Sequence, residues 1–435
     1  MKVTYHLDGS PNTHTDQRGV VHTYQYDDNR WVELDRVTNF GSSGIVDQAV
    51  KSIGRSYDTL GRTTAVTSYG TNDGTGTPVN QLAYTFDSYG MLTETDQEHD
   101  VAVDGSTLSV RYGYEESADG SNRLTNGLRQ SSLRTPWHQA NSKYLRLYYG
   151  ASGSATETRF DRLHQISGQF EQNGSYPIAD DYRYAGVNRL WTARTRWANG
   201  GANQLYLHYD GAALGDTTRG YDRFGQVIGH STSGSAGASS FGYTYDYAGN
   251  RLTRDVQTST NNVWDQKYAY DDLLRLATSD QGTLASGNIA SPTFEEDFTL
   301  DQLGNWQNLV KKTGGSTTLD QNRAHNEVNE VGTIGATTGT NWADPVHDDA
   351  GNMTTIPQPK APASGYTAIY DAWNRMVEVK DGGTTVQVNG ARSQTLNLHS
   401  PRISQIDTSH PLILTPENLP PRLAGIFFAF FPESA

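Results

Sequence analysis

The chain of 435 residues contains no cysteine. This absence excludes a disulfide framework, a thiolate zinc site and a cysteine nucleophile. Positive charge is also scarce, because 34 Lys and Arg residues stand against 48 Asp and Glu residues and leave a formal net charge of −14. No nucleic-acid partner is expected, since contacts to phosphates require a basic surface.

Long apolar runs are missing as well. The longest one, residues 423–431, is interrupted by Gly425 and is shorter than the roughly 18 residues that a membrane helix needs. We therefore expect no membrane-spanning segment. The N-terminal stretch MKVTYHLDGS has no apolar core, so we expect no secretory signal peptide in this chain.

Aliphatic residues are few, but tyrosine and glycine are abundant. Hydrophobic residues make up 35% of the chain, and this figure includes 25 tyrosines; there are also 44 glycines. Disordered chains are poor in aromatic residues. The combination of tyrosine and glycine favours extended β-structure with many turns.

One short pattern recurs along the chain. Two aromatic residues separated by one position precede an Asp, and a Gly or Asn follows shortly after, often with an Arg and an alternating stretch. The clearest copies lie at residues 24–30, 57–62, 84–90, 221–226, 243–253, 268–271 and 370–375, and degenerate copies at 112–115, 160–162, 182–184, 300–305 and 347–352. The spacing is loose, from 24 residues (246 − 222) to 31 (58 − 27) between successive aspartates.

Each part of the pattern has a physical interpretation. Aromatic side chains two positions apart lie on one face of a strand. The Asp accepts hydrogen bonds from the next backbone N–H groups and closes a turn, and the Gly tolerates positive φ. The predicted turn residues are Asp27, Asp58, Gly61, Asp87, Gly90, Asp222, Gly225, Asp246, Gly249, Asp271, Asp301, Gly304 and Asp371.

One repeat therefore predicts one β-hairpin. A single hairpin is marginal in water and needs neighbours on both sides, so the hairpins should line up into one extended, twisting antiparallel sheet. The predicted fold class is all-β, with tandem hairpins. We divide the chain into an N-terminal lead-in (1–14), the repeat region (15–384) and an atypical tail (385–435).

These repeats resemble the YD-repeat, or Rhs, family. The resemblance rests on copies such as YDTLGRTTAV from Tyr57 and YTYDYAGNRLTRD from Tyr243, and it covers roughly residues 15–380. It implies a sheet that spirals into a shell, here a partial one, and an extracellular or cell-surface location. The family includes bacterial surface and secreted proteins, toxin-complex subunits that enclose a toxic segment, and animal adhesion receptors.

The chain departs from the family at its self-cleavage signature, Asp-Pro-x-Gly-Leu. Its only Asp-Pro pair is Asp344-Pro345, which is followed by Val346 and His347. No catalytic aspartate is transferred from the family, and no self-cleavage is expected.

The tail differs in composition from the repeats. Tyr370 is the last tyrosine, and six of the 15 prolines follow position 400. Three interpretations stay open: a variable toxin tip, a short disordered tail, or sequence read in a different frame that leaves a truncated product.

The carboxylates offer one candidate for chemistry. Two of them could form a glycosidase pair, but their recurrence at equivalent repeat positions favours a role in turns. We expect no enzyme activity, no catalytic residue, no cofactor and no metal; loops 72–77 and 100–105 lack the spaced oxygen ligands of a calcium loop. The remaining ligand candidates are tryptophans that could stack on sugars if exposed, namely Trp31, Trp191, Trp306 and Trp373. Packing against neighbouring hairpins is the favoured role for most of the tryptophans, because an indole buries a large area and usually finds a partner for its N–H.

Three functional hypotheses follow. The first is a noncatalytic structural repeat segment of a surface or secreted shell, possibly a fragment that lacks the core and toxin tip. The second is a carbohydrate- or cell-surface-binding adhesin module. The third is a toxin-associated encapsulating protein with a short C-terminal effector. The expected partners are accordingly a protein cargo or a cell-surface glycan.

Overall fold

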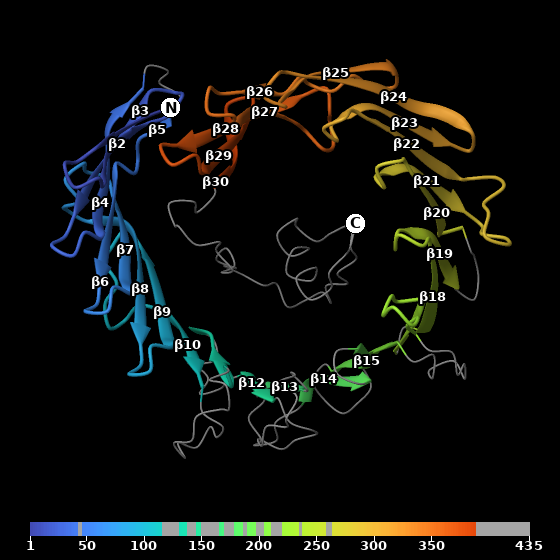
Figure 1. Ribbon diagram of the computed structural model, residues 1–435, viewed down its shortest axis with the longest axis horizontal. Coiled ribbons are helices and arrows are strands. Elements are labelled where there is room, and N and C mark those ends of the chain that lie inside the picture. The colour runs from blue at the N-terminus through green and yellow to red at the C-terminus, as the bar shows by residue number, and fades with distance from the viewer. Residues whose placement is uncertain are drawn as a thin grey trace. The chain divides into compact units, whose positions relative to one another are not determined.

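The computed structural model describes residues 1–41, 46–114, 130–136, 145–148, 165–168, 178–185, 189–196, 204–209, 220–234, 237–257 and 263–388. Within these ranges the secondary-structure elements are strands, and they form two sheets built from hairpins (Figure 1). The predicted all-β fold with long antiparallel sheets is confirmed. No described helix is long and apolar enough to cross a membrane.

The larger sheet contains 24 strands. It begins with β1 (Lys2–Tyr5), β2 (Pro11–Thr15), β3 (Val20–Tyr26), β4 (Val32–Phe40), β6 (Ser52–Tyr57), β7 (Thr63–Tyr69), β8 (Pro78–Phe86), β9 (Leu92–His99) and β10 (Ser109–Gly113). It continues through β11 (Ser132–Arg134), β12 (Leu145–Tyr148), β13 (Gln165–Gly168), β14 (Ile178–Ala185), β15 (Arg189–Arg196), β16 (Gln204–His208) and β17 (Gly229–Gly234). It ends with β18 (Gly237–Tyr245), β19 (Arg251–Gln257), β20 (Asp265–Tyr270), β21 (Leu276–Gly282), β22 (Phe294–Leu300), β23 (Trp306–Thr313), β24 (Ser316–His325) and β25 (Val331–Thr338).

The smaller sheet contains six strands. It consists of β26 (Val346–His347), β27 (Met353–Pro357), β28 (Gly365–Asp371), β29 (Met376–Asp381), β30 (Thr384–Val388) and β5 (Val46–Asp47). β5 comes from the N-terminal part of the chain and pairs in parallel with the end of β28. A segment of the first repeats is thus hydrogen-bonded to the last one.

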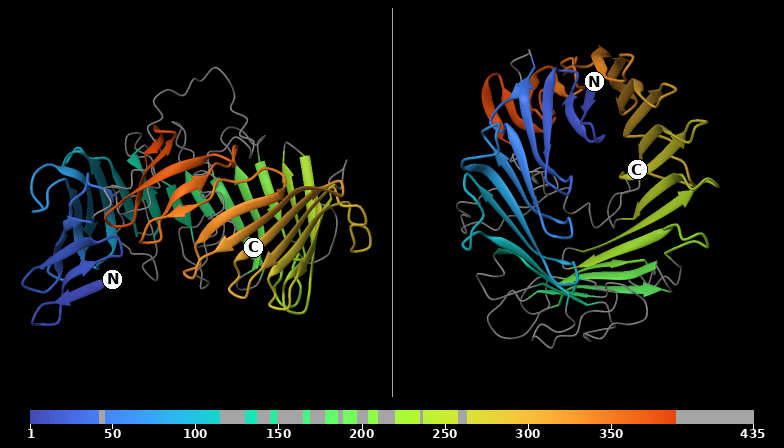
Figure 2. Two further views of the ribbon diagram at one scale, coloured as in Figure 1. Left: turned by 90° about the horizontal axis from the view of Figure 1, so that it is seen from above. Right: turned by 60° about the vertical axis from the view of Figure 1, so that its left-hand side comes forward.

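Strand order follows chain order in the larger sheet. Each of its strands pairs antiparallel with the one before and the one after it, as in β6–β7–β8–β9. Figure 2 shows this succession from two further directions, with strands of adjacent colour lying next to each other. The arrangement follows from the repeat, because consecutive hairpins cover each other's edges and satisfy backbone groups that would otherwise be unpaired.

Two clusters of buried apolar residues lie where the first repeats meet the last. One buried cluster contains Val20, Val37, Val46 and Ala372, with Phe40 and Trp373 packed against it. A second contains Val50, Ile53 and Val66, with Val79, Tyr84 and Trp373 packed against it. Trp373 therefore links both clusters to the final hairpin.

The predicted divisions of the chain fall on the structure as follows. The lead-in, residues 1–14, holds β1 and most of β2, which join the larger sheet. β30 runs to Val388, and the remainder of the predicted tail lies outside the described residues.

Candidate functional site

The hairpin turns share one hydrogen-bond pattern over five residues, which we number 1 to 5 from the Asp. In the turn that begins at Asp58, the backbone N–H of Asp58 donates to the carbonyl of Arg62, and that of Gly61 donates to the carbonyl of Asp58, both at 3.0 Å. Asp58 Oδ1 accepts from the N–H groups of Leu60 (2.9 Å) and Arg62 (3.0 Å). The aspartate thus satisfies backbone donors that the turn leaves unpaired.

The other predicted turn aspartates lie in the same position. Their Oδ1 atoms accept hydrogen bonds from the N–H groups of positions 3 and 5. In the turn at Asp246 the Oδ1 atom accepts from position 5, and the backbone hydrogen bonds of that turn are the same as in the others. These aspartates are Asp27, Asp87, Asp222, Asp246, Asp271, Asp301 and Asp371. Side-chain and backbone hydrogen bonds from Asn250 lower the pKa of the Asp246 carboxyl, as a carboxylate that accepts N–H donors requires.

Position 4 of each turn has positive φ, and position 5 reaches across to the next turn. A Cβ on Gly61 (φ +81°) would lie 2.7 Å from Cζ2 of Trp31, which occupies position 5 of the previous turn. The same approach recurs where the side chain at position 5 lies beside the next glycine, in the pairs Arg62–Gly90, Gln226–Gly249, Arg275–Gly304 and Glu330–Gly351. Positive φ therefore favours glycine at position 4, and at Gly61 the close approach of the Trp31 ring favours it as well.

Replacing Gly61 by alanine is expected to destabilise this stack. The left-handed backbone conformation alone costs a residue with a side chain about 1–3 kcal/mol, and Trp31 must also shift. The measurement is the midpoint of urea unfolding. Gly335→Ala is the matched control, because Gly335 is exposed, has no positive φ and has open space around it; an equal loss in both variants would contradict the prediction.

A second contact between turns comes from the tyrosine that precedes the aspartate. The hydroxyl of Tyr270 donates to the backbone carbonyl of Arg251, the first strand residue after the previous turn, at 2.8 Å. The same bond joins Tyr26 to Pro11, Tyr57 to Val32, Tyr114 to Leu92, Tyr221 to Leu190, Tyr245 to Val227 and Tyr370 to Met353. This recurring bond explains why the repeat uses tyrosine there rather than phenylalanine.

The Tyr270→Phe variant is expected to lose about 1 kcal/mol of stability, the usual net value of one hydrogen bond. Burial raises the pKa of the Tyr270 phenol above its usual value near 10. The contribution of this proton is therefore complete below about pH 10 and lost as the pH rises through the folded-state pKa. Urea unfolding at neutral and alkaline pH measures both effects, with Tyr247→Phe as the control because Tyr247 is fully exposed.

Turn position 3 differs from positions 4 and 5 in its exposure. It is a large apolar residue exposed to solvent in several repeats, namely Leu60, Tyr89, Phe224, Leu273, Leu303 and Val328. Arg18 and Trp373 occupy the same position without being exposed. Arg18, in the turn that begins at Asp16, is buried, and Trp373, in the turn that begins at Asp371, is half-buried.

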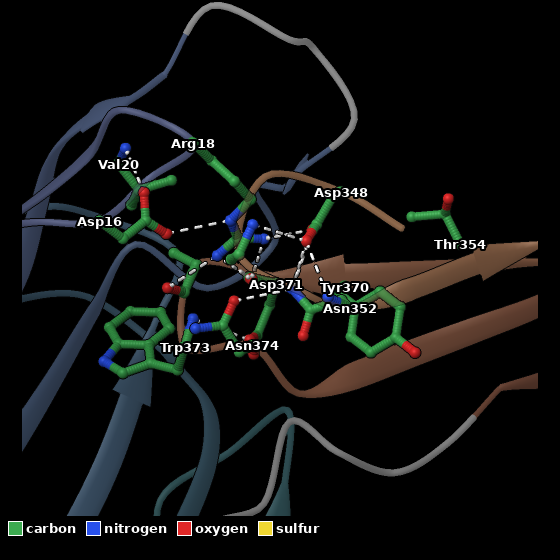
Figure 3. Close-up of polar contacts among 12 residues, drawn as sticks. Asp16, Arg18, Val20, Asp348, Asn352, Thr354, Tyr370, Asp371, Trp373 and Asn374 are labelled. Carbon is green, nitrogen blue, oxygen red and sulfur yellow. Dashed lines mark hydrogen bonds and ion pairs between the residues drawn. The ribbon is translucent and has the colours of Figure 1, made fainter. Parts of the chain in front are cut away.

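These two residues join the first repeats to the last in what we call the closing contact, formed by Asp16, Arg18, His22, Asp35, Asp348, Asp371, Ala372 and Trp373. Figure 3 shows the part of this contact in which Arg18 meets Asp16, Asp348 and the turn that carries Asp371. The Arg18 guanidinium is 5% exposed. Its Nε donates to Asp16 Oδ2 at 3.0 Å, and Nη1 lies 3.5 Å from Asp348 Oδ2. Its Nη atoms also donate to the backbone carbonyls of Asp371 (3.3 Å) and Ala372 (3.4 Å). One cation therefore links three turns.

His22 and Trp373 form the other half of the closing contact. Nδ1 of His22 lies 2.8 Å from Asp35 Oδ1, and Nε2 lies 3.1 Å from the carbonyl oxygen of Ala372. The Trp373 indole N–H donates to Asp35 Oδ2 at 2.8 Å, and its ring stands edge-on to His22 at a centroid distance of 5.2 Å. The two carboxylate oxygens of the buried Asp35 therefore have different partners. Oδ1 is bonded to His22 in the first repeats, and Oδ2 to Trp373 in the last repeat.

The two kinds of chemical site weighed from the sequence were a glycosidase carboxylate pair and a metal site. No group of three or more His, Asp and Glu side chains in the described ranges could hold a metal ion. The turn aspartates belong to separate turns, where they accept backbone N–H groups. The arrangement of these residues can hold turns together, and the closing contact can hold distant repeats together.

The tryptophans predicted to stack on sugars lie in different surroundings. Trp31 packs on Tyr57 at 5.3 Å and covers Gly61, and Trp373 belongs to the closing contact. Trp306 is 39% exposed and packs beside Phe298 at 5.1 Å. The side chain of Trp191 lies outside the described residues. Sugar stacking stays a prediction.

Several functional residues escaped sequence reasoning. The turn at Asn326 has the same hydrogen bonds as the Asp turns, although Asn replaces Asp and Glu330 replaces the usual position 5 donor. Arg30 and Leu274 have positive φ at position 4 without being glycine. Arg18 and His22 carried no signal beyond their position next to a turn, because their partners are more than 300 residues away.

Comparison with known proteins gives likeness of structure only. No family model and no curated protein matches the chain. It is similar to TcdB2-TccC3 without its hypervariable C-terminal region, with 11% identity and a TM-score of 0.46 over 86% of this chain and 20% of that one. It is also similar to the Photorhabdus luminescens Tc holotoxin pore (11% identity, TM-score 0.37, 87% of this chain and 21% of that one) and to TcdB2-TccC3-Cdc42 (10%, 0.34, 87% and 23%). The chain thus spans about a fifth to a quarter of the length of these structures.

Proposed function

We propose that the chain is a noncatalytic scaffold segment of an Rhs-type shell, acting outside the cell or at its surface, where it separates a polypeptide cargo from its surroundings. The observation that carries the proposal is the closing contact. Repeats that contact only their neighbours can separate at any interface. Arg18 and Asp371, 353 positions apart, tie the ends of the described repeat region to each other.

The chemistry of the contact supports a structural role. Buried charges are costly unless they are paired and hydrogen-bonded. Arg18 is paired with Asp16 and Asp348, and Asp371 is paired with Arg375 through an Nε to Oδ2 bond of 2.7 Å. These groups lie in the turns of hairpins, and their charges are used in pairs that hold one turn to another.

The proposal is tested by protection of a cargo. A protease-sensitive reporter peptide fused after Val388 should be digested more slowly than the free peptide, and Trp373→Ala should restore fast digestion. The matched control is Trp264→Ala, since Trp264 is 60% exposed. Equal digestion of the fused and free reporters would contradict the role of a wall.

A second candidate, an adhesin module, is favoured by one observation. The guanidinium of Arg323 lies 4.7 Å from the ring centre of the partly exposed Trp306 and 5.7 Å from that of Trp342. Indole rings beside a cation are suited to sugars that carry acidic groups. Binding on a glycan array that is lost in Trp306→Ala and kept in Tyr247→Ala would favour this function over the scaffold.

The third candidate places a toxic effector in residues 385–435. All but the first four residues of this segment lie outside the described ranges, so the proposal stands on the family resemblance. Expression of the segment alone in a bacterium tests it, and normal growth would exclude it.

A further inference from the structure

The closing contact contains one titratable group that changes charge near neutral pH. His22 is 6% exposed, and both of its ring nitrogens face oxygen acceptors: Nδ1 faces the Asp35 carboxylate at 2.8 Å and Nε2 the Ala372 carbonyl at 3.1 Å. Neither acceptor can donate a hydrogen. A neutral imidazole has a single N–H, so only the imidazolium form satisfies both contacts.

We propose that His22 is a pH-sensitive latch of the closing contact, which holds the last hairpin when protonated and loosens it when neutral. Asp35 is the stronger acceptor because it is charged, so a neutral His22 keeps its hydrogen on Nδ1. Nε2 then turns a lone pair toward the carbonyl oxygen of Ala372. The turn that carries Ala372 and Trp373 therefore loses its hydrogen bond to His22 and is loosened, but Arg18 still donates to the carbonyls of Asp371 and Ala372 at 3.3–3.4 Å.

The charged groups around His22 agree with this assignment. Asp35 on β4 and Asp16 in the first turn face it with negative charge, and His14 on β2 lies 6.3 Å away between ring centres. From the last hairpin it meets the Ala372 carbonyl and the edge of Trp373. Burial opposes protonation of His22, but the hydrogen bond and charge of Asp35 outweigh it and raise the pKa.

The sign of the pH dependence follows. A histidine with a pKa raised above its unfolded value of about 6.5 stabilises the folded contact fully below that pH, and the contribution is lost as the pH rises through the folded-state pKa. Between the two pKa values the opening equilibrium changes by about tenfold for each pH unit. The contact should be tight at pH 5.5 and looser at pH 8.5.

Hydrogen exchange of the full chain tests the latch, with rates corrected for the intrinsic dependence on pH. In the wild type, protection of a peptide covering residues 366–376 should fall measurably between pH 5.5 and 8.5, while the β20–β21 hairpin keeps its protection. This window avoids titration of the buried His230, because burial and the nearby Arg254 and Arg251 lower its pKa to about 4. Unchanged protection of residues 366–376 would overturn the proposal.

Variants assign the effect to the imidazole. His22→Gln should remove the pH dependence and leave residues 366–376 weakly protected at both pH values, whereas His14→Gln should keep it. If His22→Gln does not fold, exchange of the ring C2 hydrogen gives the His22 pKa in the wild-type protein, and a value at or below about 6.5 would overturn the latch. The latch deepens the proposed scaffold role, but neither measurement needs a cargo, so failure of reporter protection and failure of the latch are separate results.

Discussion

Replacing Trp373 by alanine should open the closing contact while the separate hairpins stay folded. The indole packs against both buried apolar clusters, stands edge-on to His22 and donates its N–H to Asp35. Truncation of a large aromatic side chain in a core costs about 3–5 kcal/mol, and the orphaned Asp35 oxygen adds to the loss. Because Trp373 is half-buried, we expect about 3 kcal/mol, the lower end of that range.

Two measurements distinguish loss of this contact from general unfolding. In hydrogen exchange, residues 46–53 and 366–376 should lose protection together, because β5 pairs with β28, while β20–β21 should not change. Urea unfolding of Trp264→Ala gives the control, since that indole is 60% exposed and its removal should change stability by less than about 0.5 kcal/mol. Uniform loss of protection across all hairpins would show that Trp373 supports the whole sheet rather than the contact.

The hairpins could be predicted from sequence because every part of a turn is local. Asp58, Gly61 and Arg62 lie within five positions: the Asp58 carboxylate accepts the turn's backbone N–H groups, Gly61 has positive φ, and Arg62 directly precedes strand β7. Because the same order of residue types recurs many times along the chain, the pattern could be recognised as a repeated turn rather than a chance match. The bulge before each turn escaped prediction, for example between Thr244 and Tyr245, because an extra residue in one strand leaves the residue types unchanged.

The closing contact could not be predicted, for a physical reason. Its partners are separated by more than 300 residues, and a repeat pattern carries no information about which distant turns meet. Arg18 and Trp373 occupy a turn position that is exposed in other turns, as at Leu60 and Phe224, so the position in the repeat does not indicate their burial. Trp373 was considered as a sugar platform, whereas its indole N–H is used by Asp35.

The abundance of tyrosine also has a cause that the sequence revealed only in part. Its aromatic ring covers a strand face, which the sequence indicated, but in several repeats its hydroxyl also joins a hairpin to the previous one, as Tyr57 does to Val32. That second role depends on the register between hairpins and is visible only in three dimensions. It helps to account for a chain with few aliphatic residues, since this hydrogen bond recurs along the sheet.

Replacing Arg18 by methionine should destabilise the closing contact at least as much as the loss of Trp373. Methionine keeps much of the apolar stem and removes only the guanidinium, so Asp16, Asp348 and the carbonyls of Asp371 and Ala372 lose their shared donor. Removing one partner from a buried ionic network costs about 3–5 kcal/mol. Arg18→Lys should lie in between, because one ammonium group cannot reach acceptors on three turns.

The matched control for Arg18→Met is Arg111→Met. Arg111 also pairs with a carboxylate, Glu94, at 2.8 Å, but its side chain is 53% exposed, and such pairs are worth at most about 1 kcal/mol. A double variant then tests whether Arg18 and Trp373 belong to one cooperative contact. If they do, the loss of stability in the double variant Arg18→Met/Trp373→Ala should be clearly smaller than the sum of the losses in the two single variants. The reason is that either substitution alone already opens the closing contact. Additive losses would mean that the first and last hairpins are held by two independent contacts.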